Sequence, residues 1–580
     1  MRGFSCRPHD RLIPPAYGRG VIARGLAVVV LGLLALALTT TASPDRAARS
    51  PVPVVVRAAP LPSGGAESLV RSLGGTVTRP LPLIGGFAAL VPRSAVATLQ
   101  RSRAVADVWP DAPVRMHDDE DDGDDDFDED DIRTYDALPA NEVWRETIGL
   151  PRVDSELDGD GVTVAVLDTG VVEAPDLAGN VRARADFTPD NDGDDRYGHG
   201  THMAGIVAGD GLASVGRWRG VAPAADVVSV KVAGWDGATD VSTVLAALQW
   251  VVANKERHGI RVLNLSFGTD SGQSYLRDPL DYAVERVWEA GILVVAAAGN
   301  RGSGDGTISK PGDDPFVVTV GAADLKNTLD RTDDVVAGFS SRGPTEDGLA
   351  KPDLVAPGVT IVSSRAPNST IDAFRPAARV DESYFKGTGS SQAAAVVSGI
   401  AALMFEADPT LTPDVAKAAL VGTTTPELAG QRGAGSGLVN AAAAVSAVEA
   451  GSFRDAPANQ GLTRSTGTGS LHESRGSYRV WTDWGSDGTL DLVDNERDVL
   501  GAPWDAAGWA STPWTAAAWA ASPWAPLVGE APAFEPMPPT AATWPGMRME
   551  AEVWNAKYWS ESFWDAKYWS GKYWSSSSWN

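Results

Sequence analysis

Three side chains that could take part in acyl transfer stand far apart in this 580-residue sequence. Asp168 follows the apolar run "VTVAVL", His199 lies in "YGHGTHMAG", and Asn300 ends "VVAAAGN". A carboxylate, an imidazole and an amide could orient a base, remove a proton and stabilise an oxyanion during attack on a carbonyl group. Each residue alone is more simply explained as a turn, a buried histidine or a cap. The chemistry therefore depends on whether a suitable hydroxyl joins them.

Two adjacent serines are the candidates for that hydroxyl. The stretch "GTGSSQAAAVVSG" places Ser390 and Ser391 at the start of an Ala-rich run that predicts a helix. The N-terminus of a helix favours negative charge, which suits an attacking oxygen. The stretch alone does not say which of the two serines is the nucleophile.

The elements that would position these residues follow an alternating pattern. Continuous apolar runs predict buried strands, and helical stretches lie between them, which indicates an α/β fold with a mostly parallel sheet and helices on both faces. In such folds the sites form at the carboxyl ends of the strands. The strands are expected at 162–167, 226–232, 261–266, 292–298 and 316–322, and helices at 240–257 and 280–290.

Four blocks in this order resemble the subtilisin-like serine endopeptidases, the subtilase family. The blocks are "VAVLDTGV", "HGTHMAG", "AAAGN" and "GTGSSQAAAVVSG", and the resemblance extends over 137–450. It implies a catalytic triad of Asp168, His199 and Ser391, with Asn300 and the backbone N–H of Ser391 as the oxyanion hole. The family reads Gly-Thr-Ser-Met-Ala at the nucleophile, so Ser391 takes the third place and Ser390 replaces the threonine. Gln392 stands where methionine is usual.

The resemblance also implies how a substrate is bound. A peptide would lie as an added strand between two edges, and a third segment would line the pocket for the residue before the cut. No cofactor is required for this chemistry. The implied substrate-binding residues are Trp235, Asp236, Gly237, Leu265, Ser266, Phe267, Gly268, Ala296, Ala297, Ala298 and Gly299.

An acidic loop raises the question of a structural calcium ion. The stretch "PDNDGDDRYG" places Asp190, Asp192 and Asp194 at alternate positions, which offers oxygen ligands but lacks the full twelve-residue calcium loop. A solvated turn is the favoured explanation. A structural calcium ion is kept as an expectation because such ions are common in the resembled family.

The N-terminal part predicts export and a separate small unit. Arginines precede the 14-residue apolar run 25–38, which is typical of a signal peptide over 1–42, with a retained anchor as the alternative. Short strands and helices then indicate an α+β unit at 45–113. That unit resembles the inhibitor-like propeptide of the family; the alternative is an accessory domain. An acidic linker over 114–136 follows.

The C-terminal part is rich in tryptophan. A spacer is expected at 451–500, and from Trp504 to Trp579 a step of five residues meets tryptophan at 12 of 16 positions. We expect a Trp-repeat tail over 501–580. It would form either a four-sided solenoid or a largely disordered tail whose rings stack on cell-wall material or polysaccharide, with the second slightly favoured.

Together these features predict a secreted serine endopeptidase made as a proenzyme. Its expected partners are protein or peptide substrates and its own propeptide, and we expect a monomer. The net charge of −26 argues against a nucleic-acid partner. The rival hypothesis is a surface-binding or polysaccharide-binding protein built on an inactive protease scaffold.

Overall fold

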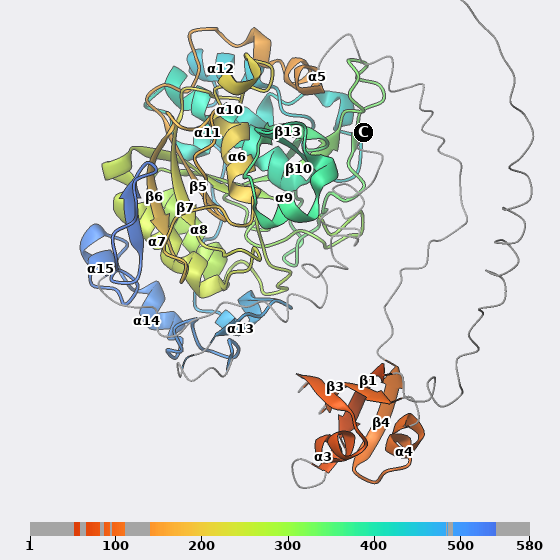
Figure 1. Cartoon of the computed structure of the whole chain (residues 1–580). Coiled ribbons are helices and arrows are strands. Elements are labelled where there is room, and N and C mark those ends of the chain that lie inside the picture. The colour runs from red at the N-terminus through yellow and green to blue at the C-terminus, as the bar shows by residue number, and fades with distance from the viewer. Residues whose placement is uncertain are drawn as a thin grey trace, which may run out of the picture. The chain divides into compact units, whose positions relative to one another are not determined.

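The computed structural model describes residues 51–58, 65–81, 86–92, 95–110, 140–482, 484 and 491–540. The chain divides into two compact units, 1–126 and 127–580, and each is described by itself (Figure 1). The predicted signal peptide, the acidic linker and the tail beyond residue 540 lie outside the described residues.

The N-terminal unit is the small α+β structure that the sequence predicts. Four antiparallel strands pair in the order β2-β3-β1-β4, and Val56, Val70, Phe87 and Leu99 form the centre of its core. Strand β1 was not expected. The elements are β1 (Pro51–Ala58), α3 (Gly65–Ser72), β2 (Thr76–Leu81), β3 (Gly86–Pro92), α4 (Val96–Gln100) and β4 (Val105–Pro110).

The second unit is built on a nine-stranded, mainly parallel sheet, so the predicted α/β architecture is confirmed. The strands follow the order β11-β10-β9-β8-β5-β7-β6-β17, and β12 also pairs with β10. Only the two outer pairings, β10 with β11 and β6 with β17, are antiparallel. The strands are β5 (Thr163–Asp168), β6 (Val181–Asp186), β7 (Asp226–Lys231), β8 (Ile260–Leu265), β9 (Leu293–Ala297), β10 (Val318–Asp324), β11 (Val335–Val336), β12 (Leu354–Pro357) and β17 (Gly529–Pro532).

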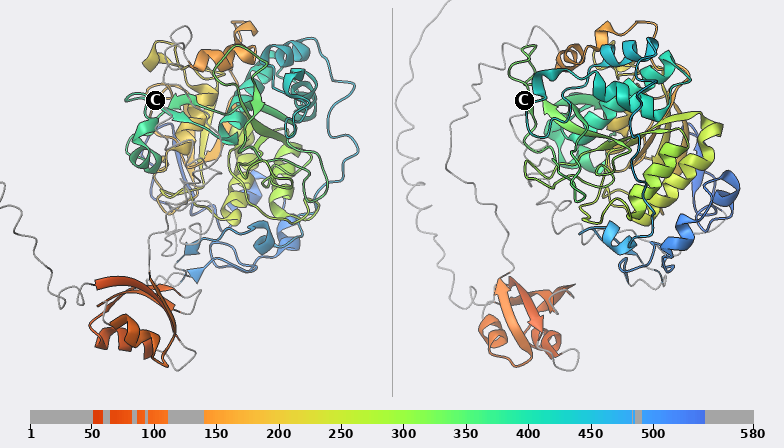
Figure 2. Two further views of the ribbon diagram at one scale, coloured as in Figure 1. Left: turned by 90° about the vertical axis from the view of Figure 1, so that its right-hand side faces the viewer. Right: turned by 180° about the vertical axis from the view of Figure 1, so that it is seen from behind.

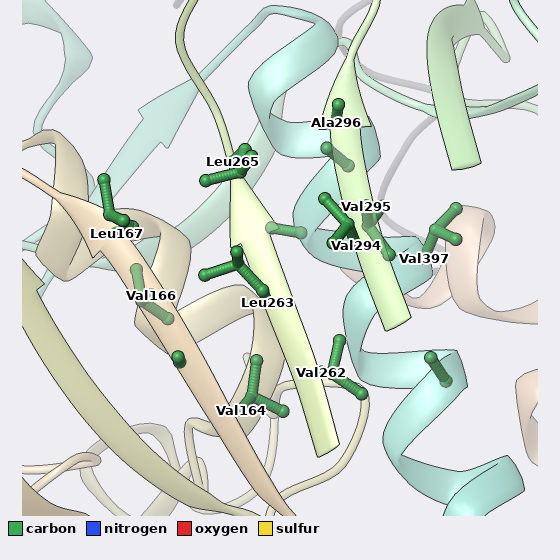
Figure 3. Close-up of a cluster of buried hydrophobic side chains, with 14 of the residues drawn as sticks. Val164, Val166, Leu167, Val262, Leu263, Leu265, Val294, Val295, Ala296 and Val397 are labelled. Carbon is green, nitrogen blue, oxygen red and sulfur yellow. The ribbon is translucent and has the colours of Figure 1, made fainter. Parts of the chain in front are cut away.

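Helices cover both faces of this sheet (Figures 1 and 2). On one side α6 (His199–Ala208) and α10 (Ser390–Ala407) pack against each other, and α10 lies over β8, β9 and β10. On the other side α7 (Val241–His258) packs against α8 (Pro279–Glu289). Figure 3 shows apolar side chains of the neighbouring strands β5, β8 and β9, with Val397 of α10 beside β9. Consecutive residues such as Val294 and Val295 point to opposite faces, so both faces of these strands are apolar. The strand ends that carry the chemistry are therefore held by a buried core.

Smaller elements complete the second unit. The remaining helices and 3-10 turns are α5 (Ala140–Thr147), η4 (Leu150–Arg152), η5 (Leu212–Ser214), α9 (Thr370–Phe374), η6 (Pro376–Ala378), α11 (Pro413–Gly422), η7 (Pro426–Leu428), α12 (Ala441–Glu449), α13 (Leu471–Ser474), α14 (Ala506–Ala510) and α15 (Ala516–Ala520). Two further strand pairs are β13 (Ile361–Ser364) with β14 (Tyr384–Gly387), and β15 (Trp481–Thr482) with β16 (Asp491–Leu492).

The described part of the tryptophan-rich region packs onto this unit, so the prediction of a separate tail is wrong for 501–540. Trp514, Trp519 and Trp524 are each only 7% exposed. The ring of Trp519 lies 5.9 Å from that of Phe187, and the ring of Trp509 lies 5.4 Å from that of Tyr282. These residues form neither a solenoid nor a disordered binding platform, because their rings are buried against side chains of the second unit such as Phe187 and Tyr282.

Within 503–522 the structure shows two ten-residue repeats. Each repeat begins with a Pro-Trp pair, continues with a capping side chain and a short helix, and carries its second tryptophan inside that helix. Asp505 accepts a hydrogen bond from the backbone N–H of Gly508 at the start of α14, and Thr515 accepts one from Ala518 at the start of α15. Within these repeats a tryptophan that precedes the helix alternates with one inside the helix, and the two are five residues apart.

One helix among the described residues is long and apolar enough to cross a membrane. It is α10, and 89% of its most apolar window is buried inside the protein. Its apolar character reflects its place in the core, where it contacts strands β5, β8, β9, β10 and β12 of the sheet.

Candidate active site

Asp168 and His199 meet at the end of the central strand. Asp168 is the last residue of β5, and His199 is the first residue of α6. Nδ1 of His199 lies 2.8 Å from Oδ1 and 3.0 Å from Oδ2 of Asp168, and both side chains are 4% exposed. Because a carboxylate accepts hydrogen bonds, Nδ1 carries the proton and Nε2 presents its lone pair.

The close approach of helix and strand depends on a glycine. A Cβ atom on Gly200 would lie 2.2 Å from the carbonyl oxygen of Gly170. Any larger residue would therefore push α6 away from the end of β5, and with it the imidazole of His199 from the carboxylate of Asp168.

Asp195, which sequence reasoning missed, fixes the turn before His199. Its two carboxylate oxygens accept hydrogen bonds from the hydroxyl of Thr169 (2.7 Å) and the backbone N–H groups of Gly198 (2.6 Å) and Thr201 (2.8 Å). Burial raises the pKa of Asp195. Its place in a run of acidic residues suggested surface charge, so nothing in the sequence marked it as a buried cap.

The two serines at the start of α10 have different surroundings. The hydroxyl of Ser391 donates to the carbonyl oxygen of Ser266 at 3.1 Å and lines the same cavity as His199. The hydroxyl of Ser390 is fully buried; it donates to Oδ1 of Asn300 at 2.9 Å and accepts from the backbone N–H of Gly299 at 3.1 Å. Ser390 therefore supports the backbone, and Ser391 faces the cavity.

Asn300 is oriented by the start of α10. Its Oδ1 atom also accepts the backbone N–H of Ser390 at 2.8 Å. An N–H donor requires an oxygen acceptor, so this contact identifies which end of the amide is oxygen. The NH₂ group of Asn300 is therefore the free end, and the residue lines the cavity together with Ser391.

His202, the neighbouring histidine, is a structural residue. It is 1% exposed, and its Nε2 atom lies 3.1 Å from the carbonyl oxygen of Phe385. Burial and the charge of nearby His199 lower the pKa of His202 to about 3. It stays neutral at ordinary pH, and its ring contacts the backbone of Phe385, which agrees with a structural place in the core.

The cavity between these residues has a volume of roughly 100 Å³ and brings together part of the expected substrate-binding set. Its lining includes Gly237, Ser266, Phe267, Gly268, Ala297 and Gly299. The side chains of Leu265, Ala296 and Ala298 are fully buried in the core. Trp235 lies outside this lining and is 53% exposed, and the Asp236 side chain accepts a hydrogen bond from the backbone N–H of Ala238 at 3.0 Å. Substrate contact by these residues stays a prediction.

Comparison with known proteins decides the family. The model of the subtilase family matches residues 159–469, more than half of the chain. The chain belongs to the subtilase family. Its relatives include the serine protease AprX of Bacillus subtilis (strain 168), which is 44% identical over 267 residues, 45% of this chain and 60% of AprX.

Other relatives are named as proteases as well. M-protease of Shouchella clausii (strain KSM-K16) is 39% identical over 289 residues, 50% of this chain and 65% of that protein. Subtilisin Savinase of Lederbergia lenta is also 39% identical over 289 residues, which cover 92% of its length. The match thus spans less than two thirds of AprX and of M-protease.

The acidic loop of this subtilase does not fit the expected calcium site in the arrangement described. The ammonium group of Lys231, which is fully buried, lies 3.3 Å from Asp190, 2.8 Å from Asp192 and 3.6 Å from Asp186. Arg196 pairs with Asp190 and Asp192 from the solvent side, and Arg184 pairs with Asp194. Side-chain cations already neutralise these carboxylates, and we derive no role for calcium from them.

One wall of the cavity comes from beyond the matched region. Arg475, Tyr478, Arg479 and Val480 line it together with the family residues. The sequence placed these residues in the expected spacer over 451–500, where the composition changes after residue 450. No motif in the sequence could have assigned them to the site.

Proposed function

We propose that this chain is a serine endopeptidase that hydrolyses peptide bonds through an acyl-enzyme. The observation that carries the proposal is the bond between Nδ1 of His199 and the carboxylate of Asp168, at a cavity that also holds Ser391 and Asn300. These four groups supply orienter, base, nucleophile and oxyanion donor within one site. The names of the relatives, which are proteases, support the same reaction class.

In the proposed reaction the Ser391 hydroxyl turns from the Ser266 carbonyl toward His199. Nε2 of His199 takes the proton as Oγ attacks the peptide carbonyl carbon, and Asp168 stabilises the imidazolium. The oxyanion accepts hydrogen bonds from the NH₂ group of Asn300 and the backbone N–H of Ser391. The C–N bond then breaks, and His199 gives its proton to the leaving amine. A water molecule, deprotonated by His199, hydrolyses the acyl-enzyme.

A fluorophosphonate probe tests this assignment directly, because it labels only an activated serine. We expect the wild type and Ser390→Ala to be labelled and to cleave casein, and Ser391→Ala to do neither. The turnover lost in Ser391→Ala should be on the order of a millionfold, a magnitude taken from subtilisin itself. An unlabelled wild type would favour the binding protein on an inactive scaffold, and labelling of Ser391→Ala would show that the nucleophile is another residue.

We further propose that the protein is exported and made as a proenzyme. Support comes from the apolar run 25–38 after several arginines, and from the N-terminal unit, which has a core of its own. In the proposal this unit assists folding of the protease and is then removed. Co-expression of 45–113 in trans should restore the active yield of a chain that begins near residue 140. Full activity of that shorter chain alone would contradict the propeptide role.

A further inference from the structure

The cavity wall formed by residues 475–480, here called the C-terminal wall, is firmly attached to both sides of the cleft. On one side the guanidinium of Arg475, 1% exposed, donates from Nε to Oδ2 of Asp240 at 2.6 Å and from Nη2 to Oδ1 at 3.2 Å. Asp240 also caps α7, whose first turn lines the cavity. The wall is therefore fixed to the helix start by an ion pair whose two members are fully occupied.

The other attachment lies next to the predicted substrate edge. The backbone N–H and the hydroxyl of Ser477 donate to the two carboxylate oxygens of Asp270, at 2.6 and 2.7 Å. The hydroxyl of Thr269 donates to the carbonyl oxygen of Ser474 at 2.7 Å. Since Gly268 lines the cavity immediately before these residues, the wall stands beside the edge along which a peptide would pair.

Arg479 brings a positive charge to this wall. Its Nη1 atom donates to the carbonyl oxygens of Gly476 (2.8 Å) and Tyr478 (2.5 Å), and its Nη2 atom lies beside His472. Asp240, Asp270 and Asp494 act on it only at longer range. Among the described residues, its hydrogen-bond acceptors are thus neutral groups, so its charge remains available to a ligand.

The other charged residues that line the cavity do not cancel this charge. Asp168 is engaged by His199, and Asp240 is engaged by Arg475. Arg301 donates to the carbonyl oxygens of Thr307 and Ile308, at 3.0 and 2.6 Å. Of the arginines in the described lining, Arg475 is paired with Asp240, whereas Arg301 and Arg479 donate to neutral groups. Asp168 accepts the N–H of the His199 ring. The described lining thus holds three arginines and two aspartates, in a chain whose net charge is −26.

We propose that the C-terminal wall is a specificity element and that Arg479 selects an acidic side chain of the substrate, at a position away from the scissile bond. The inference rests on the proposed endopeptidase function. A substrate carboxylate at this wall would accept hydrogen bonds from the guanidinium while its main chain pairs with the edge next to Gly268. Tyr478 would bound the same subsite with its ring.

The test is a peptide series in which Glu, Gln or Lys is placed in turn at each position on the acyl side of the cut. We expect one position at which Glu is preferred to Lys by roughly ten- to hundredfold in kcat/KM, mostly through KM. Arg479→Gln should abolish that preference, and Arg479→Glu should invert it toward Lys. The readout is the ratio of kcat/KM between the Glu and Lys peptides, so a general loss of activity in either variant does not affect it. Added salt should weaken the wild-type preference.

Controls separate charge recognition from loss of structure. Arg497→Gln changes an arginine outside the cavity lining whose side chain donates to the carbonyl oxygen of Gly501, and it should keep the preference. A loosened wall would reduce the kcat/KM of all peptides together and would not invert the preference, so that result overturns the inference. A wild type without any acidic preference overturns it as well. Absence of cleavage and of fluorophosphonate labelling would instead refute the endopeptidase function.

Discussion

Oδ1 of Asn300 accepts two hydrogen bonds from Ser390, one from its backbone N–H at 2.8 Å and one from its hydroxyl at 2.9 Å. The first serine of the pair thus orients the amide that would face the oxyanion, and the second is left to attack. Ser390 therefore has a positioning task, and Ser391 is the expected nucleophile.

Ser390→Ala should lower kcat about tenfold while KM changes little. The substitution removes one of the two hydrogen bonds to Oδ1 of Asn300 and leaves the backbone N–H of Gly299 without its acceptor, which costs on the order of 1–2 kcal/mol in positioning. Ser390→Thr keeps the hydroxyl and should restore most of kcat. Steady-state kinetics on a chromogenic peptide measure both variants. Equal kcat in Ser390→Ala and the wild type would contradict the positioning role.

Asn300→Ala should reduce kcat by about a hundred- to a thousandfold and leave KM nearly unchanged, because the amide acts on charge that develops only in the transition state. This magnitude is the one established for removal of the oxyanion-hole asparagine of subtilisin. Fluorophosphonate labelling should slow in parallel. A variant that loses only substrate affinity would show that Asn300 does not face the oxyanion.

Glu285→Gln should remove part of the destabilisation of the protein by alkali. Burial, and the charge of Asp314, raise the pKa of Glu285 to about 9, and burial raises that of Asp314 to about 6. For a carboxyl with a raised folded-state pKa, the stabilising contribution is full below about pH 4.5 and is lost as the pH rises toward 9. The melting temperature of inhibited wild type should therefore fall between pH 6 and 9.

The glutamine variant should flatten this slope. It keeps an acceptor for the backbone N–H of Ser465, which donates to Oε1 of Glu285 at 2.8 Å, and it has no proton to lose. Glu256→Gln, which changes an exposed acid of α7 that pairs with Lys255 at the surface, is the control and should leave the slope unchanged. Parallel slopes in wild type and Glu285→Gln would refute the assignment.

Lys231→Met should destabilise the protein by about 3–5 kcal/mol, because it strands the carboxylates of Asp186, Asp190 and Asp192 around a buried apolar side chain. Urea unfolding in a Ser391→Ala background, which prevents self-digestion, measures the loss. Arg196→Met removes an exposed partner of the same loop and should cost about 1 kcal/mol or less. Equal losses in the two variants would mean that Lys231 does not hold the loop together.

Trp519→Ala should lower the free energy of unfolding by about 3–5 kcal/mol, since its ring is 7% exposed and packs beside Phe187. Trp235→Ala removes a ring that is 53% exposed and should change stability by about 0.5 kcal/mol or less. Chemical unfolding of both variants tests the contrast. An unchanged free energy of unfolding in Trp519→Ala would mean that the described tryptophans form a loosely attached tail.

The sequence predicts the central strands well because they are continuous apolar runs. The expected 226–232 and 292–298 correspond to β7 and β9 within two residues at each end. Strand β6 escaped notice because "VRARAD" looks like a polar surface segment. Arg184 and Asp186 are in fact buried, and they are neutralised by Asp194 and Lys231 from other parts of the chain. Such partners are visible only after folding.

The residues of the site also fall into a predicted group and a group that was not predicted. Asp168, His199, Asn300 and Ser391 were placed by resemblance to a family, and the fold brings them to one cavity. The roles of Asp195, Ser390 and the C-terminal wall were not predicted. Ser390 and the wall act through contacts with residues far away in the sequence, and Asp195 joins nearby backbone N–H groups to the distant hydroxyl of Thr169. Local spacing holds no trace of such contacts. The five-residue tryptophan spacing is real in the sequence, but it does not reveal that loop and helix tryptophans alternate over 503–522.

Strand β17 completes the sheet, so the pairing of this edge depends on the order of synthesis. Gly529 to Pro532 pair with β6, and Glu530 also receives the indole N–H of Trp250 at 2.8 Å. The ribosome synthesises β6 long before β17. The backbone groups of β6 on this edge therefore stay unpaired until most of the polypeptide has been made. Unpaired edges recruit other chains. Residues 529–532 thus cover the exposed edge of β6 at a late stage, after the rest of the sheet has been synthesised.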